Sequence, residues 1–150
     1  MTLFIDGDAF PNLLKPIVLR AIERACLETY VIANKKINVG KSSFIRYMIV
    51  EAGADEADNK IVELLKENDL VITADIPLAS EIVKLGALAI NPRGELYDED
   101  NINERLSMRD FMTELREGGL VTGGPDSYGP KDKANFTNSL NRILVKKGFS

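Results

Sequence analysis

The sequence alternates short apolar runs with segments of helical periodicity, and this alternation limits the chain to few folds. The apolar runs of strand length are LFI (3–5), TYVIA (29–33), FIRYMIV (44–50), LVITA (70–74) and ALAI (87–90). Apolar residues at helical spacing fill the segments 12–27, 55–68 and 77–86 between them. Repeated strand–helix–strand units predict a mostly parallel sheet with helices on both faces, an α/β fold of three layers, α/β/α.

Two parts of the chain depart from this alternation. Residues 34–43 are rich in Lys, Asn, Gly and Ser and predict a loop between two strands. After residue 91 we expect a loop, one or two helices over 102–119, a Gly- and Pro-rich connection over 121–133 and an amphipathic helix over 134–148. We therefore predict one domain over 1–150, with a C-terminal helical extension from about 95 that packs on it.

Acidic residues follow several predicted strands. Asp6 and Asp8 leave the first strand at alternate positions, and Asp75 ends the fourth. Asp55 and Asp58 open the helix after the third strand. Because ligands of an open parallel sheet bind beyond the carboxyl ends of its strands, we expect all five at one edge. Carboxylates about 4 Å apart repel by roughly 4 kcal/mol at an effective dielectric near 20, so a cation or a proton should offset this repulsion.

Helix capping is the alternative explanation for three of these acids. Asp55 and Asp75 each stand where a helix begins, and Asp58 lies in a first helical turn, where the helix dipole favours acids. Capping does not explain why Asp6 and Asp8 share their edge. A site for one or two divalent cations explains all five residues, and we favour it.

The composition narrows the chemistry of such a site. The chain has no histidine, which excludes Ser-His-Asp catalysis and histidine-ligated zinc. A metal must be held by oxygen, so we predict Mg²⁺ or Mn²⁺, no zinc and no nucleotide cofactor. The formal net charge of -4 argues against binding nucleic acid by charge alone.

The single cysteine and the length of the apolar runs indicate the cellular compartment of the protein. Cys26 excludes an internal disulfide and is expected to be a core residue. Each apolar run is shorter than the roughly 18 residues of a membrane span, and the N-terminus has no basic leader. We expect a cytoplasmic protein that does not interact with the membrane.

With these motifs placed, the sequence resembles the bacterial YaiI/YqxD family, also called DUF188 or UPF0178. The resemblance spans essentially the whole chain and rests on IDGDAFP, AGADEADNKIV, DLVITADIPLA, INPRGELYDEDNI, MRDFMTELR, TGGP and KDKANFTNSLNRIL. It implies a fold similar to PIN and NYN nuclease domains. It also implies a metal-dependent nuclease site, onto which Asp6, Asp55 or Asp58, and Asp75 map. Asp8 belongs to the family's own strand-end motif, and Phe10, where many relatives have Cys, is expected to fill a core position.

Polar residues near the same edge are candidate substrate contacts. Asn91 and Arg93 follow the fifth predicted strand, and Arg93 could reach a phosphate, although a turn or an ion pair would also explain it. Lys35 and Lys36 lie in the 34–43 loop and could contact nucleic acid, although surface loops normally carry charge. The backbone amides of Thr122–Gly124 could bind an anion, but a plain turn is the better explanation.

These observations favour a metal-dependent nuclease with nucleic acid as its partner. The resemblance to PIN and NYN domains alone implies that RNA is preferred over DNA. The candidate catalytic residues are Asp6, Asp55, Asp58 and Asp75, and Asp8 joins them as a metal ligand or neighbouring acid. One alternative is a non-catalytic binding or regulatory module with the same architecture. Another is a phosphatase that uses the D-x-D of residues 6–8, against which no later Lys and paired acids are evident. A homodimer is compatible with the sequence.

Overall fold

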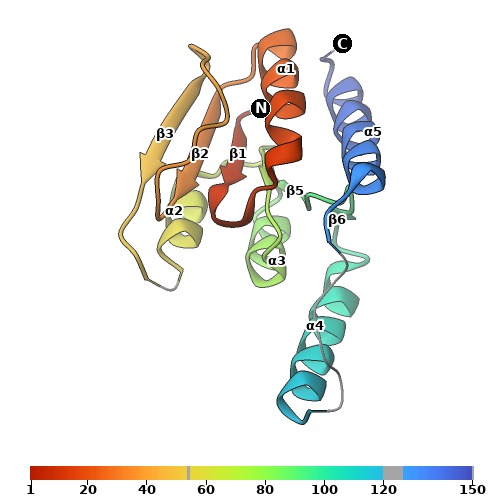
Figure 1. The fold of residues 1–150 in the computed structure, drawn as a ribbon. Coiled ribbons are helices and arrows are strands. Elements are labelled where there is room, and N and C mark those ends of the chain that lie inside the picture. Colours follow the sequence, from red (N-terminus) through yellow and green to blue (C-terminus); the bar gives the residue numbers. More distant parts are fainter. Residues whose placement is uncertain (54, 120–126, 150) are drawn as a thin grey trace.

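The computed structural model describes residues 1–53, 55–119 and 127–149, and it has a central sheet between two layers of helices (Figure 1). Within these residues the sheet has six strands in the order β3-β2-β1-β4-β5-β6. The strands are β1 (Leu3–Asp6), β2 (Thr29–Ala33), β3 (Ile45–Ile49), β4 (Leu70–Ile72), β5 (Leu88–Ile90) and β6 (Leu96–Tyr97). The predicted turn at Thr122, Gly123 and Gly124 lies outside the described residues.

The predicted fold class is confirmed. Strands β1 to β5 pair in parallel, and β6 joins β5 in antiparallel orientation. The β2–β3 connection, residues 34–43, is a loop as predicted. Strand β6 was predicted to be part of a loop, because a strand of two residues is too short to show an alternating pattern.

Five helices lie in the described part of the chain: α1 (Lys15–Ala25), α2 (Glu56–Leu64), α3 (Ile76–Lys84), α4 (Ile102–Glu117) and α5 (Pro130–Lys146). Alternate residues of β1 face opposite layers, as the pleat of a strand requires. Leu3 and Ile5 pack with side chains of α1 and α5, whereas Phe4 packs with those of α2 and α3. Asp6 has the parity of Phe4 and so leaves the strand on the α2/α3 side.

The two C-terminal helices differ in how they meet this core. Helix α5 buries Phe136 and Leu140 beside α1, and Arg24 of α1 donates a hydrogen bond of 3.1 Å to Asn141. Helix α4 buries only Ile102 among its described residues and runs away from the sheet (Figure 1). It leaves Met108 55% exposed and Phe111 54% exposed.

Prolines in the first turn explain where α1 and α5 begin. Pro16 stands in the first turn of α1, so the regular helix starts later than the predicted residue 12, after a short 3-10 turn (Asn12–Leu14). Helix α5 begins at Pro130, within the segment predicted as a connection. Its first turn is closed by Asp132, which accepts a hydrogen bond of 3.0 Å from the Gly129 amide.

Cys26 and Phe10 were both expected to be buried in the core, and their exposure tests this prediction. Cys26 is exposed, so the prediction of a core cysteine is wrong. It ends α1 with φ of 50°, in the left-handed region, and this cap position turns it to solvent. Phe10 is 9% exposed and packs in the core beside α1, as expected.

Candidate functional site

The predicted acids meet in one pocket. A hollow of about 330 Å³ is lined by Ala74 and by the five aspartates Asp6, Asp8, Asp55, Asp58 and Asp75. They come from the end of β1, the turn after it, the start of α2 and the start of α3. We call this hollow the acidic pocket.

Asp6 is the last residue of β1 and is held from two sides. Its Oδ2 accepts a hydrogen bond of 2.8 Å from the hydroxyl of Thr73, and its Oδ1 accepts one of 3.4 Å from the Asp8 amide. The second bond caps a 3-10 turn, η1 (Gly7–Ala9). The strand therefore ends before Asp8, and the expectation that both aspartates extend from one strand at alternate positions is wrong.

Asp8 reaches the pocket from this turn. Its Oδ1 accepts a hydrogen bond of 2.9 Å from the amide of Asn34, the first residue after β2. The turn fits closely against β2, because a Cβ at Gly7 would lie 3.0 Å from the Cβ of Ala33. Asp8 thus connects the end of β1 to the start of the 34–43 loop.

Asp75 caps α3, as the capping alternative predicted. Its Oδ1 accepts a hydrogen bond of 3.0 Å from the Leu78 amide. Its own amide donates one of 3.0 Å to the hydroxyl of Thr73. Thr73 is 1% exposed and joins Asp6 to Asp75, a role that the sequence analysis missed. Its position two residues before Asp75, at a strand end, was the available signal.

The capping alternative is wrong for Asp55. It stands at the N-cap position of α2 but its side chain makes no capping hydrogen bond. Its φ of 69° lies in the left-handed region, which is uncommon for a residue with a side chain. Asp58 lies in the first turn of the same helix and is partly buried.

Burial and mutual repulsion raise the pKa of two of these carboxyl groups. Burial is the main cause at Asp58, followed by the charges of Asp75 and Asp6, and together they raise its pKa to about 7. Burial also raises the pKa of Asp6, although the hydrogen bonds from Thr73 and from the Asp8 amide oppose this shift. In the metal-free protein, Asp58 therefore carries a proton for much of the time near neutral pH.

The donor set suits a hard divalent cation, since every side chain lining the acidic pocket with a ligating atom is a carboxylate. The same side chains do not converge on one point. Across residues 1–53, 55–119 and 127–149, no group of three or more His, Cys, Asp or Glu is placed to hold a metal ion. Binding a cation would therefore require rotation of these carboxylates.

The predicted substrate residues Asn91 and Arg93 line a neighbouring pocket of about 470 Å³, which shares Ala74 with the acidic pocket. Asn91 closes the turn before β6, because its Oδ1 accepts hydrogen bonds of 2.9 Å from the amides of Arg93 and Glu95. Arg93 pairs with Asp132 at 3.0 Å and lies 5.8 Å above the ring of Tyr128. Both side chains thus have structural partners, and their contact with substrate stays a prediction.

Lys35 and Lys36 lie on the other side of the acidic pocket. With Lys15 and Asp8 they line a hollow of about 420 Å³, here called the lysine pocket. The side chains of Lys35 and Lys36 are exposed. The lysine pocket and the acidic pocket have Asp8 in common.

The comparisons with known proteins agree with the family resemblance. The family model described as "Uncharacterized BCR, YaiI/YqxD family" matches residues 4–146. A UPF0178 protein of Sulfurovum sp. (strain NBC37-1) is 62% identical over 146 residues, which cover 97% of this chain and 99% of the relative. A UPF0178 protein of Sulfurimonas denitrificans is 58% identical over 146 residues, covering 97% of each chain.

A comparison with solved structures finds no significant match. The likeness to PIN and NYN domains therefore stays a prediction. None of the helices in the described part of the chain is long and apolar enough to cross a membrane.

Proposed function

We propose that this chain, which belongs to the YaiI/YqxD family, is a metal-dependent nuclease that hydrolyses phosphodiester bonds. The observation that carries this proposal is the acidic pocket, where five aspartates from separate segments line one hollow. Burial, followed by repulsion from the carboxylates of Asp75 and Asp6, raises the pKa of Asp58 to about 7. A divalent cation would relieve this repulsion.

Asp6, Asp58 and Asp75 are the proposed core of the cation site, with Asp55 and Asp8 at its margin. Mg²⁺ or Mn²⁺ held there supplies an activated water and charge stabilisation for in-line displacement at a phosphodiester. Thr73 holds Asp6 through its hydroxyl and so fixes the direction of one carboxylate. Asp75 is fixed by the cap of α3, in which its Oδ1 accepts a hydrogen bond from the Leu78 amide.

RNA is the preferred substrate in this proposal, and that preference rests on the resemblance to PIN and NYN domains. One observation favours a second function, a non-catalytic binding module. The carboxylates share a pocket without converging in the described part of the chain, as expected if the edge holds no catalytic ion. The two functions differ in whether a phosphodiester bond is broken.

The test is cleavage of end-labelled single-stranded RNA and DNA in Mn²⁺, with EDTA as the blank. Asp58→Asn should abolish cleavage, because it removes a proposed ligand from the acidic pocket. Asp110→Asn is the matched control, since Asp110 is an exposed aspartate of α4 outside that pocket. Cleavage by Asp58→Asn at the wild-type rate would refute the site. Phosphate release from a phosphomonoester, without cleavage of either oligonucleotide, would indicate a phosphatase.

A further inference from the structure

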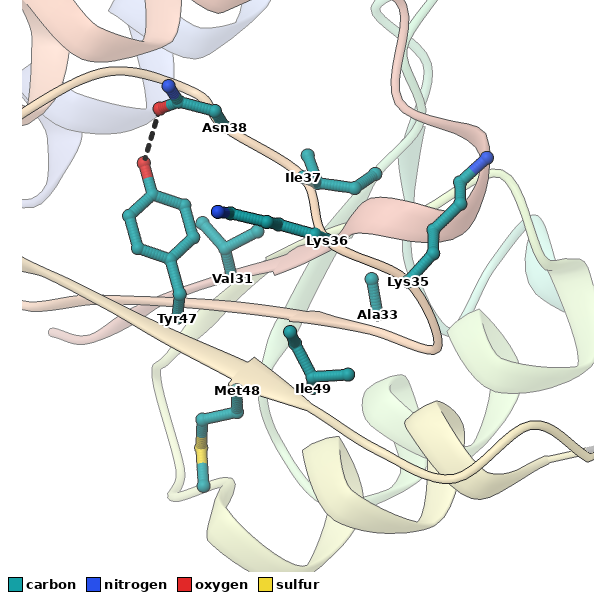
Figure 2. Close-up of a pocket in the computed structure, with 9 residues that line it drawn as sticks. All are labelled: Val31, Ala33, Lys35, Lys36, Ile37, Asn38, Tyr47, Met48 and Ile49. Atoms are coloured by element: carbon teal, nitrogen blue, oxygen red, sulfur yellow. Dashed lines mark hydrogen bonds between the residues drawn. The ribbon is translucent and has the colours of Figure 1, made fainter.

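A further hollow opens beside β3, the strand at one edge of the sheet. Its volume is about 280 Å³, and the 34–43 loop forms one of its walls. The residues that line it are Val31, Ala33, Lys35, Lys36, Ile37, Asn38, Tyr47, Met48 and Ile49 (Figure 2). Val31 and Ala33 lie at its buried side, whereas Tyr47 is 43% exposed and Ile49 is 64% exposed. We call this hollow the Tyr47 pocket.

The aromatic wall of the Tyr47 pocket is fixed in place. The hydroxyl of Tyr47 donates a hydrogen bond of 2.6 Å to the Gly40 carbonyl oxygen. It also accepts hydrogen bonds from the amides of Gly40, at 3.1 Å, and Val39, at 3.2 Å. These bonds hold the ring against the loop, so a ligand would meet a preformed flat apolar surface.

The Tyr47 pocket is linked to the proposed active site through lining residues shared with the lysine pocket. It shares Lys35, Lys36, Ile37 and Asn38 with the lysine pocket, which in turn shares Asp8 with the acidic pocket. A path of adjoining hollows therefore runs from the carboxylates, past the lysines, to an aromatic and aliphatic pocket. Figure 2 shows Lys36 extending across the Tyr47 pocket toward the ring, whereas Lys35 points away from it.

This order of charges fits one kind of ligand. Two positive side chains between an apolar pocket and a cation site match a chain of phosphates that carries flat apolar groups. The volume of about 280 Å³ is just below the roughly 300–1,000 Å³ of pockets for drug-sized ligands, which suits one flat ring system. A base inside a duplex is stacked on both faces and cannot enter such a pocket.

We propose that the Tyr47 pocket receives one unpaired base of a single-stranded nucleic acid, whose backbone passes Lys35 and Lys36 on its way to the acidic pocket. This inference rests on the proposed function, because it places the base beside the scissile site. It adds the substrate class: single-stranded chains with an unpaired base a short distance from the cleaved bond.

The test measures binding without cleavage. A fluorescein-labelled single-stranded oligonucleotide is titrated with the full chain in Ca²⁺, and a gel checks that the probe stays intact. Ile49→Glu places a carboxylate at the mouth of the pocket on an exposed position. It should weaken binding by about fivefold or more, the effect of losing one base–aromatic contact. Val145→Glu is the matched control, because Val145 is 68% exposed on α5 and lines none of these hollows.

A second probe separates base binding from simple attraction to phosphates. The same oligonucleotide with abasic sites should bind wild type more weakly, and this difference should vanish in Ile49→Glu. Lys35→Gln with Lys36→Gln should reduce the salt dependence of binding by about two phosphate contacts. Lys84→Gln with Lys146→Gln makes the same charge change at the ends of α3 and α5. This control should leave the salt dependence of binding unchanged.

Three results would overturn the inference. The first is equal binding of the intact and abasic probes by wild type, and the second is tighter binding of the paired duplex than of the single strand. The third is a wild-type dimer that Ile49→Glu converts to a monomer in sedimentation, which would make the pocket an interface between copies.

Base-dependent binding with no cleavage in Mn²⁺ would refute the nuclease and leave the Tyr47 pocket standing. Cleavage in Mn²⁺ with no effect of Ile49→Glu or of abasic sites would support the nuclease and refute the Tyr47 pocket as a base site.

Discussion

The hydroxyl of Thr73 donates a hydrogen bond of 2.8 Å to Oδ2 of Asp6, although the two residues lie 67 positions apart in the sequence. The same hydroxyl accepts a bond from the amide of Asp75. One buried side chain at the end of β4 therefore sets the relative positions of two acids of the acidic pocket. The register of β1 with β4, in which Ile5 pairs with Ile72, brings these strand ends together.

Replacing Thr73 by Val should weaken binding of a cation at the proposed site. The variant keeps the shape of the side chain but removes the hydrogen bond to Asp6, and a bond to a charged group is worth about 1.5–3 kcal/mol. Mn²⁺ affinity, measured by calorimetric titration, should fall about tenfold or more. Thr73→Ser keeps the hydroxyl and should bind Mn²⁺ nearly as wild type does. Equal affinities in Thr73→Val and wild type would show that Thr73 does not position a ligand.

Mn²⁺ or Mg²⁺ should raise the melting temperature. A ligand that binds only the folded state stabilises it by about 2.7 kcal/mol at a hundredfold excess over its Kd, or roughly 5–10 °C for a chain of this length. Asp6→Asn combined with Asp75→Asn should abolish the rise. Differential scanning with and without EDTA measures the melting temperature of each variant. An unchanged rise in the double variant would place the cation elsewhere.

The stability of the metal-free protein should fall as pH rises from about 4 to about 7. The pKa of Asp58 is raised to about 7 in the folded protein, above the roughly 3.9 of an unfolded aspartate. Protonated Asp58 therefore favours folding at low pH, and this contribution is lost as the pH rises through the folded pKa. Asp58 is partly exposed, so after solvent screening we expect a loss of about 1–2 kcal/mol.

Urea unfolding in EDTA, followed by tyrosine fluorescence at several pH values, measures how steeply the free energy of unfolding falls with pH. We call this dependence the slope. Asp58→Asn should flatten it, and Asp110→Asn should leave it as in wild type. In saturating Mn²⁺ the trend should reverse, because carboxylates must lose their protons to bind the ion. A slope that survives in Asp58→Asn would assign the effect to other groups.

Asp75→Asn should leave the metal-free protein as stable as wild type or make it more stable. Asn can retain the cap to the Leu78 amide, and the change removes one charge from the repelling cluster. Asp75→Ala loses the cap as well and should cost about 1 kcal/mol more than Asp75→Asn in urea unfolding. A loss of several kcal/mol in Asp75→Asn would mean that the charge itself supports the fold.

The sequence predicted the sheet and the meeting of the acids because both depend on local patterns. Buried apolar runs mark the parallel strands, and the rule that their carboxyl ends share an edge places Asp6 near Asp75 without any coordinates. The details that were predicted wrongly or missed depend on individual side-chain hydrogen bonds, one within a turn and one between distant strands. The end of β1 at Asp6 is set by the turn that Asp6 caps, and the role of Thr73 depends on its register with β1. Neither leaves a periodic signal in the sequence.

The surroundings of the predicted substrate contacts were harder to predict for a related reason. Arg93 follows a strand end, as an active-site arginine would, but its ion pair is with Asp132, which lies 39 positions further on. Lys35 and Lys36 looked like ordinary loop charges. Their place beside the Tyr47 pocket depends on Tyr47 holding the loop at Gly40, a contact between a strand and a loop that composition cannot show.

The connection between β2 and β3 is short for two parallel strands, which are usually joined by a crossover helix. A helix there would lie over Val31 and Tyr47 and would fill the space that these side chains leave open. The length of this connection is thus a property that can be read from any relative's sequence. Relatives whose connection is long enough for a helix should have lost the hollow, whereas those that keep the short form should retain it. Variation in connection length then becomes a way to sort the family by whether its members can form the proposed base pocket, before any further structure is determined.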